Sequence, residues 1–241
     1  MADDMPKVRR TLYTVVIKRL LDIVLSGFAI IILSPLLLIV SVLEIIYHGH
    51  PILYSQERPG LHGKIFKVYK FRSMTNETDE NGELLPSEQR LTSFGRFIRR
   101  FSLDELPELF CIFTGKMSII GPRPLLVRYL PLYTPRHMMR HEVRPGFACV
   151  PLKPIKTWSW NDQFENDIWY VENVSFLLDV KMILSLVKMV FSFGKRGNQA
   201  QGRGITYFIG YNEKGQAMSL INYRELAAEG KYPVYDGGSS K

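Results

Sequence analysis

Two adjacent carboxylates, Asp104 and Glu105, are the residues of this chain best suited to chemistry. They lie in the stretch SLDELPELF, after an arginine cluster and before Pro107. A carboxylate pair can act as a nucleophile, exchange protons or bind a divalent cation. The spacing by itself favours a structural role, because Ser102 and Glu105 fit a capping box and acidic residues stabilise the first turn of a helix. The spacing alone leaves both interpretations open.

An arginine between two prolines follows shortly after this pair, at Arg123 in the sequence GPRP. Because proline restricts the backbone on both sides, this tripeptide presents one guanidinium group in a defined direction. A guanidinium held in this way suits the recognition of an anion such as a phosphate. The motif alone is weak evidence, since rigid turns with an exposed arginine are common.

The overall composition also favours an anionic partner. The chain has 241 residues, 46% of them hydrophobic, and a formal net charge of +8. Such a charge suits nucleic acid, phospholipid head groups or a phosphorylated substrate. The two cysteines, Cys111 and Cys149, provide neither a disulfide framework nor the spacing of a metal site, which is typical of a reducing compartment.

A stretch without charged residues, Ile23–Leu43, is long enough to cross a bilayer but carries Ser34 and Pro35 near its middle. Pro35 deprives the carbonyl of Ile31 of its helical partner, and the Ser34 hydroxyl can bond back to that carbonyl or to the carbonyl of Ile30. Residues 23–34 would rise roughly 18 Å as a helix, against about 15 Å for half a hydrocarbon core. Each limb can therefore reach the middle of the bilayer.

The charges around this stretch favour a re-entrant hairpin, a helix-break-helix element that enters and leaves on one side. Basic residues on both sides mark both flanks as cytoplasmic, before the stretch Lys7, Arg9, Arg10, Lys18 and Arg19, and after it Arg58, Lys64, Lys67, Lys70 and Arg72. A spanning helix would send one of these flanks outward. A proline-kinked spanning helix remains the alternative.

The chain after the apolar stretch contains several short elements. Residues 52–74 read as two extended runs joined by a Pro-Gly turn. Basic and aromatic residues alternate in the second run, which suits either nucleic-acid binding or an exposed edge strand. Residues 75–90 are polar and acidic, typical of a loop. Beyond Lys195 we expect a linker, a small hairpin within residues 205–221 and a short helical segment at 222–230.

Two amphipathic helices are predicted. Over Leu91–Phe101 the helical period places apolar residues on one face and arginines on the other. Asp179–Phe193 has a similar apolar stripe and is too short to span a membrane. Each helix could cover a soluble core or lie in the membrane interface.

Taken together, the motifs resemble one family. Lys18-Arg19-x-x-Asp22, Ser34-Pro35, YKFRSM, SLDELPEL, GKMSIIGPRP and VRPG occur in the order seen in bacterial sugar transferases. Over about residues 15–190 the chain resembles the small, monotopic polyprenyl-phosphate phosphoglycosyl transferases. The resemblance implies an α/β-like membrane protein. Its expected parts are an N-terminal segment and re-entrant hairpin at 1–46, a catalytic domain with short helices and a small sheet at 47–194, and a linker and tail at 195–241.

The resemblance also implies a reaction. A sugar-1-phosphate would pass from a UDP-sugar to polyprenyl (undecaprenyl) phosphate, with release of UMP, and would prime bacterial glycan assembly. Asp104 would be the nucleophile, and Asp104 and Glu105 would hold Mg²⁺, although Glu105 could instead accept a proton. Lys70, Arg99 and Arg123 are the candidates for phosphate and nucleotide contacts. Lys18, Arg19 and Asp22 would position the anchor at the head-group boundary.

One segment departs from the family pattern. After Arg144-Pro145-Gly146 the chain reads FACVPLKPIKTW, residues 147–158, where the family usually has a glycine-rich run with an arginine. An inactive family member that acts as a membrane adaptor for a glycan-assembly complex is therefore the alternative function. We expect location on the cytoplasmic face of the bacterial inner membrane, with phospholipids as partners and without nucleic acid.

Overall fold

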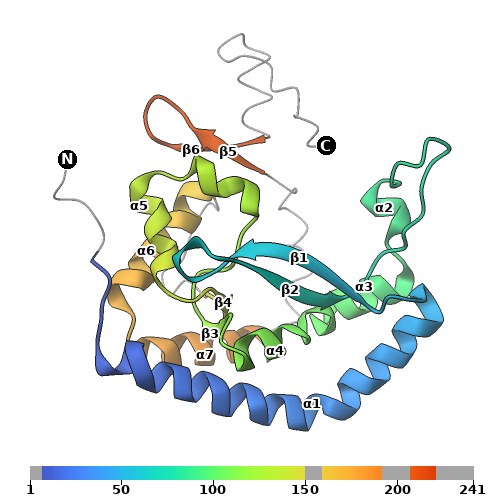
Figure 1. The fold of residues 1–241 in the computed structure, drawn as a ribbon, viewed down its shortest axis with the longest axis horizontal. Helices are drawn as coiled ribbons and strands as arrows, with labels where there is room; N and C mark the ends of the chain where they lie inside the picture. The colour runs from blue at the N-terminus through green and yellow to red at the C-terminus, as the bar shows by residue number, and fades with distance from the viewer. Residues whose placement is uncertain (1–6, 150–158, 192–206, 221–241) are drawn as a thin grey trace.

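The computed structural model describes residues 7–149, 159–191 and 207–220. Figure 1 shows a long helix, α1 (Lys18–His48), along the base of a domain of short helices and strands. A π-helical turn, η1 (Tyr13–Ile17), leads directly into α1. The helical stretch from Tyr13 to His48 is apolar and long enough to cross a membrane, judged by length and composition. This agrees with an apolar N-terminal segment attached to an α/β-like domain.

The domain is built from short elements. In chain order they are β1 (Leu53–Pro59), η2 (Leu61–Gly63), β2 (Ile65–Phe71), α2 (Ser87–Arg90), α3 (Ser93–Arg100), η3 (Leu103–Glu105), α4 (Glu108–Phe113), β3 (Ser118–Ile120), η4 (Val127–Leu132), α5 (Pro135–Met138), η5 (Met139–Glu142), β4 (Gly146–Ala148), α6 (Trp160–Asn173), α7 (Phe176–Phe191), β5 (Phe208–Tyr211) and β6 (Ala217–Ser219).

Helix α1 continues through Pro35 and bends near its middle (Figure 1). The Ser34 hydroxyl donates a hydrogen bond of 2.8 Å to the carbonyl oxygen of Ile31, as the sequence predicted. This is the carbonyl that Pro35 leaves without a helical partner. Because Ser34 satisfies it, the expected break is a bend inside one helix and not a turn between two separate helices.

The first limb of α1 is attached to the domain by polar contacts. The Arg19 guanidinium donates hydrogen bonds of 2.6 and 2.7 Å to the carbonyl oxygens of Ile112 and Phe113, at the end of α4. Asp22, which is 4% exposed, accepts a hydrogen bond of 3.0 Å from the backbone N–H of Ile119 in β3. The start of α1 therefore has a fixed position against the domain.

The second limb of α1 packs against α3. Val40 and Ile98 belong to one buried cluster. Near the end of α1, His48 lies 2.9 Å from Glu44 and 2.8 Å from the Thr92 hydroxyl, and Thr92 is the N-cap of α3. Both limbs of the bent helix thus return to the same domain.

The two amphipathic helices lie where the sequence placed them, with adjusted ends. Helix α3 covers Ser93–Arg100, and α7 begins at Phe176, three residues before the expected start. On α3, Ile98 is fully buried, but Phe97 and Phe101 of the same predicted face are each 51% exposed. The apolar face of α3 is therefore only partly used by the core.

Strands β1 and β2 form the hairpin expected from residues 52–74. They pair antiparallel from Leu53 opposite Phe71 to Pro59 opposite Ile65. The other strands form two further pairs, β3 with β4 in parallel and β5 with β6 antiparallel. Among the described residues the expected small sheet is thus three separate two-stranded sheets.

The parallel pair β3–β4 explains glycines in two of the motifs. Gly121 of GPRP and Gly146 of VRPG lie so close that a β-carbon on either would collide with the backbone of the other segment. Only glycine allows two backbones to approach in this way. The two motifs are therefore parts of one packed structure.

The C-terminal hairpin belongs to the domain core. Phe208 of β5 is 2% exposed and packs with Tyr129, Tyr133 and Phe164. The expected hairpin within residues 205–221 is thus present as β5–β6. The linker around 195–206, the helical segment at 222–230 and most of the altered segment 147–158 lie outside the described residues.

Candidate active site

A cavity of about 860 Å³ lies between the β1–β2 hairpin and the α3–η3 segment. All five side chains predicted to act on the substrate line it, namely Lys70, Arg99, Asp104, Glu105 and Arg123. Its other cationic residues are Arg58, Arg72 and Arg90. Six cations face two carboxylates, and this excess of positive charge suits a strongly anionic ligand.

The backbone places Asp104 and Glu105 at the end of the arginine-rich helix. Ser102 follows α3 in the left-handed region, with φ of 56°, and the short η3 helix (Leu103–Glu105) begins after it. The Ser102 side chain makes no capping hydrogen bond, so the capping-box interpretation is wrong. Pro107 precedes the first residue of α4, where its missing N–H is tolerated.

Glu105 is the carboxylate that carries the ion pairs. Nζ of Lys70 and a terminal nitrogen of Arg123 both donate to its Oε1 atom, at 2.5 and 2.6 Å. Burial opposes ionisation of this group, but the charges of Arg123 and Lys70 outweigh it and lower the pKa of Glu105. Glu105 therefore stays ionised and holds the two cations together.

Asp104 has a different environment. Burial and the adjacent Glu105 charge raise the pKa of Asp104, while Lys70 and Arg99 oppose the shift. Asp104 forms no ion pair within the described residues. The site thus drives the pKa values of two neighbouring carboxylates in opposite directions, which is how one site assigns them different roles.

Arg99 is positioned by the YKFRSM segment. Its Nε atom donates a hydrogen bond of 2.7 Å to the Ser73 hydroxyl. A β-carbon on Gly95 would collide with the backbone of Ser73, so α3 can pack against this segment only with glycine there. The neighbouring Arg72 donates to the carbonyl oxygen of Pro51 at 3.0 Å and is 8% exposed. These contacts fix the part of the cavity wall that Arg99 and Arg72 form.

Several residues of the site were missed at the sequence level. Glu108 is a third carboxylate, 6% exposed and 3.1 Å from Nζ of Lys70, and burial raises its pKa. Arg58 faces the cavity from β1, where burial and the nearby charge of Arg123 lower its pKa. Arg72 and Glu108 lie within the quoted motifs YKFRSM and SLDELPEL, so their signal was available, whereas nothing local distinguishes Arg58.

The chemistry of the two carboxylates fits a magnesium ion, and Asp104 and Glu105 are the residues that would hold it. Mg²⁺ usually takes only one or two carboxylates from the protein, together with phosphate oxygens and water. Asp104 and the second oxygen of Glu105 provide such a pair, because Lys70 and Arg123 both use Oε1. The described residues contain no group of three or more acidic, histidine or cysteine side chains that could hold a metal ion.

The predicted anchor residues lie elsewhere. Lys18 forms an ion pair of 2.5 Å with Asp179 of α7, and Arg19 and Asp22 bond to α4 and β3 as described above. Ser34 and Pro35 lie at the bend of α1. None of these five lines the cavity. Contacts with the domain position the anchor, and its location at the level of the head groups stays a prediction.

The fold and the site together define a class of protein: an apolar, bent helix carrying a domain with a carboxylate pair in a cationic cavity. The chain belongs to the bacterial sugar transferase family, which it matches over residues 13–193. The match includes α1 and the whole of the candidate site.

Individual relatives agree with this assignment. The chain is 46% identical over 176 residues to EpsL of Bacillus subtilis, an uncharacterized sugar transferase, and the match covers 73% of this chain and 87% of EpsL. It is 36% identical over 185 residues to a UDP-glucose:undecaprenyl-phosphate glucose-1-phosphate transferase of Klebsiella pneumoniae, with 71% and 39% covered. It is 33% identical over 192 residues to an undecaprenyl-phosphate galactose phosphotransferase of Salmonella typhimurium, with 72% and 40% covered. The chain thus spans most of EpsL and about two fifths of the other two relatives.

Proposed function

We propose that this protein transfers a sugar-1-phosphate from a UDP-sugar to a polyprenyl phosphate, releases UMP and so primes the assembly of a bacterial glycan. The observation that carries the proposal is the carboxylate pair Asp104–Glu105 inside a cavity lined by six cations. A nucleotide diphosphate sugar and a lipid phosphate are both anionic, which suits such a cavity. The names of the Klebsiella and Salmonella relatives support the same reaction class but give different sugars.

In the proposed mechanism Asp104 is the nucleophile. One of its carboxylate oxygens attacks the phosphorus that bears the sugar and forms a new O–P bond. The bond from this phosphorus to the bridging oxygen of the diphosphate breaks, and UMP leaves with that oxygen. An oxygen of the polyprenyl phosphate then attacks the same phosphorus and releases Asp104. A raised pKa supports this role, because a more basic carboxylate is a better nucleophile once it is ionised.

The remaining groups offset the charge. A carboxylate that approaches a diphosphate is repelled, and catalysis of phosphoryl transfer depends mainly on positioning and on stabilising this charge. Lys70, Arg99 and Arg123 bind the phosphate oxygens and orient the donor. Glu105 fixes Lys70 and Arg123 relative to Asp104. A magnesium ion held by Asp104 and Glu105 would neutralise the negative charge on the diphosphate and on the leaving UMP.

We further propose that the protein is monotopic, on the cytoplasmic face of the bacterial inner membrane. Both limbs of α1 contact the same domain, which lies on the inner side of the bend (Figure 1). A re-entrant helix requires this arrangement. The domain also exposes large apolar side chains on and beside the helices near α1, namely Phe97 of α3 and Phe101 directly after it, Phe110 and Phe113 of α4, and Leu177 and Leu184 of α7. Exposed apolar faces of this kind suit helices that lie in the interface.

Release of UMP from a panel of UDP-sugars tests the reaction. The full chain in detergent is incubated with Mg²⁺, polyprenyl phosphate and each donor in turn. We expect UMP with at least one donor, and a loss of at least about 10³-fold with Asp104→Asn, as for the removal of a nucleophile. Glu213→Gln, an exposed carboxylate in the β5–β6 hairpin, is the matched control and should retain full activity.

Two outcomes would contradict the proposal. An Asp104→Asn variant with full turnover would eliminate Asp104 as the nucleophile. No UMP from any donor, while a related transferase is active in the same assay, would eliminate the reaction and favour the membrane adaptor.

A further inference from the structure

A second cationic cavity lies beside the start of α1, at the opposite end of the β1–β2 hairpin from the strand ends near Asp104. It has a volume of about 310 Å³ and shares no lining residue with the candidate active site. Its cationic residues are Arg9, Arg10, Lys18, Arg19 and Arg144, against the carboxylates Asp22 and Glu142. The excess of positive charge suits an anionic ligand.

One polar group in this cavity lacks a partner. Ser118 is fully buried, and no described residue forms a hydrogen bond with its hydroxyl. Leaving a buried hydroxyl unpaired costs free energy, so a buried group of this kind normally has a partner. Because Ser118 lines the cavity, a ligand within the cavity can supply the acceptor.

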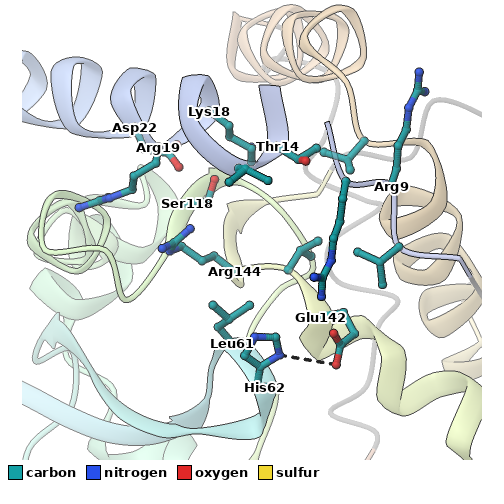
Figure 2. Close-up of a pocket in the computed structure, with 15 residues that line it drawn as sticks. Arg9, Thr14, Lys18, Arg19, Asp22, Leu61, His62, Ser118, Glu142 and Arg144 are labelled. Carbon is teal, nitrogen blue, oxygen red and sulfur yellow. Dashed lines mark ion pairs between the residues drawn. The ribbon is translucent and has the colours of Figure 1, made fainter. Parts of the chain in front are cut away.

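Arg144 lies next to Ser118. Figure 2 shows its guanidinium group directed toward Ser118 and Asp22, below the first turns of α1. Its Nε atom donates to the carbonyl oxygen of Gly115 at 3.1 Å, which fixes the side chain. Among the described residues its two terminal nitrogens have no hydrogen-bond partner. An arginine held by Nε presents its terminal N–H groups to an anion in a defined direction.

Each carboxylate that lines the cavity lies beside a group of the domain. Asp22 accepts the backbone N–H of Ile119, and Glu142 lies 3.6 Å from the His62 ring, on the far side of the cavity in Figure 2. Lys18 and Arg19 also have partners in the domain. The groups available to a ligand are therefore the Ser118 hydroxyl and the outer nitrogens of Arg144, with Arg9 and Arg10 exposed at the rim.

The location indicates which anion would bind. Val15, which lines the cavity, is 64% exposed, and the neighbouring Leu12 is 70% exposed. Arginines beside exposed apolar side chains at the start of an apolar helix are typical of the head-group layer. The volume is also at the lower end of small-molecule sites, which leaves room for a phosphate together with its polar substituent.

We propose that this cavity is a binding site for the phosphodiester head group of an anionic phospholipid, with Ser118 and Arg144 as its main contacts. The bound head group would hold the start of α1 at the membrane surface, apart from the reaction at Asp104. The proposal rests on the membrane attachment proposed above and does not depend on the transferase reaction.

The test is lipid binding to the purified full chain in a non-ionic detergent, measured by native mass spectrometry with added phosphatidylglycerol. Ser118→Ala and Arg144→Gln should each weaken binding about tenfold or more, as expected for the loss of a hydrogen bond to a charged group. Lys67→Gln removes an exposed cation that lines neither cavity and should bind as the unaltered protein does. Asp104→Asn should bind phosphatidylglycerol as the unaltered protein does. Lipid binding can therefore be confirmed or contradicted whatever the outcome of the UMP assay.

If Arg144→Gln does not fold, the melting temperature of Ser118→Ala still tests the proposal. Removing an unpaired hydroxyl should not lower the melting temperature in lipid-free detergent, whereas the rise in melting temperature on adding phosphatidylglycerol should be smaller than in the unaltered protein. Equal binding by all variants would overturn the proposal. Competition by inorganic phosphate at the same concentration as the lipid would overturn the assignment to a lipid head group.

Discussion

Arg140 donates a hydrogen bond of 2.9 Å to the backbone carbonyl oxygen of Arg123. The same guanidinium forms hydrogen bonds of 2.6 and 3.0 Å with one carboxylate oxygen of Asp167 in α6. Arg140 is 2% exposed and Asp167 is fully buried. A buried ion pair between η5 and α6 therefore fixes the backbone of the Pro-Arg-Pro segment through the bond from Arg140 to the Arg123 carbonyl. The Arg123 side chain extends into the candidate active site.

Breaking this ion pair should destabilise the domain. Asp167→Asn leaves the buried Arg140 guanidinium without its charge partner, which typically costs about 3–5 kcal/mol. We expect a clear fall in melting temperature. Replacing both residues, as in Arg140→Met with Asp167→Leu, should cost less than the sum of the two single changes, because no unpaired charge remains. A single variant as stable as the unaltered protein would show that the pair carries no such role.

The pH dependence of UMP release should reflect Asp104. Burial and the charge of Glu105 raise its pKa. The nucleophile must be ionised, so activity should be lost as the pH falls through this raised pKa. The acid limb of kcat/KM should accordingly lie above pH of about 3.9, the ordinary value for aspartate.

Lys70 provides a check on this assignment. Its charge lowers the pKa of Asp104, so Lys70→Gln should move the acid limb to higher pH, in addition to any loss of rate. Lys67→Gln, the matched change on the exposed side of β2, should leave the limb where it is. An acid limb that does not move with Lys70→Gln would contradict the role of Asp104 as the titrating group.

Arg123 should contribute more to substrate binding than to stability. Its side chain is 58% exposed and reaches Glu105 at 2.6 Å. Lysine keeps the charge but cannot form two parallel hydrogen bonds with one phosphate. Arg123→Lys should therefore raise KM for the UDP-sugar about tenfold, corresponding to about 1.4 kcal/mol, with little change in melting temperature. An unchanged KM would remove Arg123 from the donor site.

Much of the site could be predicted from the sequence because its signals are local or depend on motif order. The Pro-Gly turn between two extended runs predicts the β1–β2 hairpin, and the helical period over Leu91–Phe101 predicts α3. The expected bond from Ser34 to Ile31 depends on residues three positions apart. The order of the motifs led to the family resemblance, and this resemblance implied the five side chains that meet in one cavity.

The contacts that could not be predicted join distant parts of the chain. Lys18 and Asp179 are 161 positions apart, and neither carries a local sign of the other. The same holds for Phe208, whose burial among Tyr129, Tyr133 and Phe164 makes the C-terminal hairpin part of the core. That Glu105 and not Asp104 carries the ion pairs was also hidden, since it depends on where Lys70 and Arg123 lie in space.

The bend at Pro35 should determine the topology of α1. Pro35→Ala restores an N–H group that can bond to the Ile31 carbonyl, so the helix should straighten and its second limb should leave the contacts of Val40 with Ile98 and of His48 with Thr92. A straight apolar helix of this length can cross the bilayer. We therefore expect that in a fraction of the variant molecules the N-terminus lies on the outer side of the membrane.

Labelling of single cysteines in spheroplasts with a membrane-impermeant maleimide measures this. Lys7→Cys should be protected in the otherwise unaltered protein and become labelled in part with Pro35→Ala, while Asn81→Cys, in an exposed loop of the domain, should be protected in both. The native cysteines should contribute little, since Cys111 is 3% exposed and Cys149 is half-buried with its thiol pKa raised by burial. Labelling of Lys7→Cys from outside without the Pro35 change would mean that the helix spans the membrane, and the monotopic arrangement would be wrong.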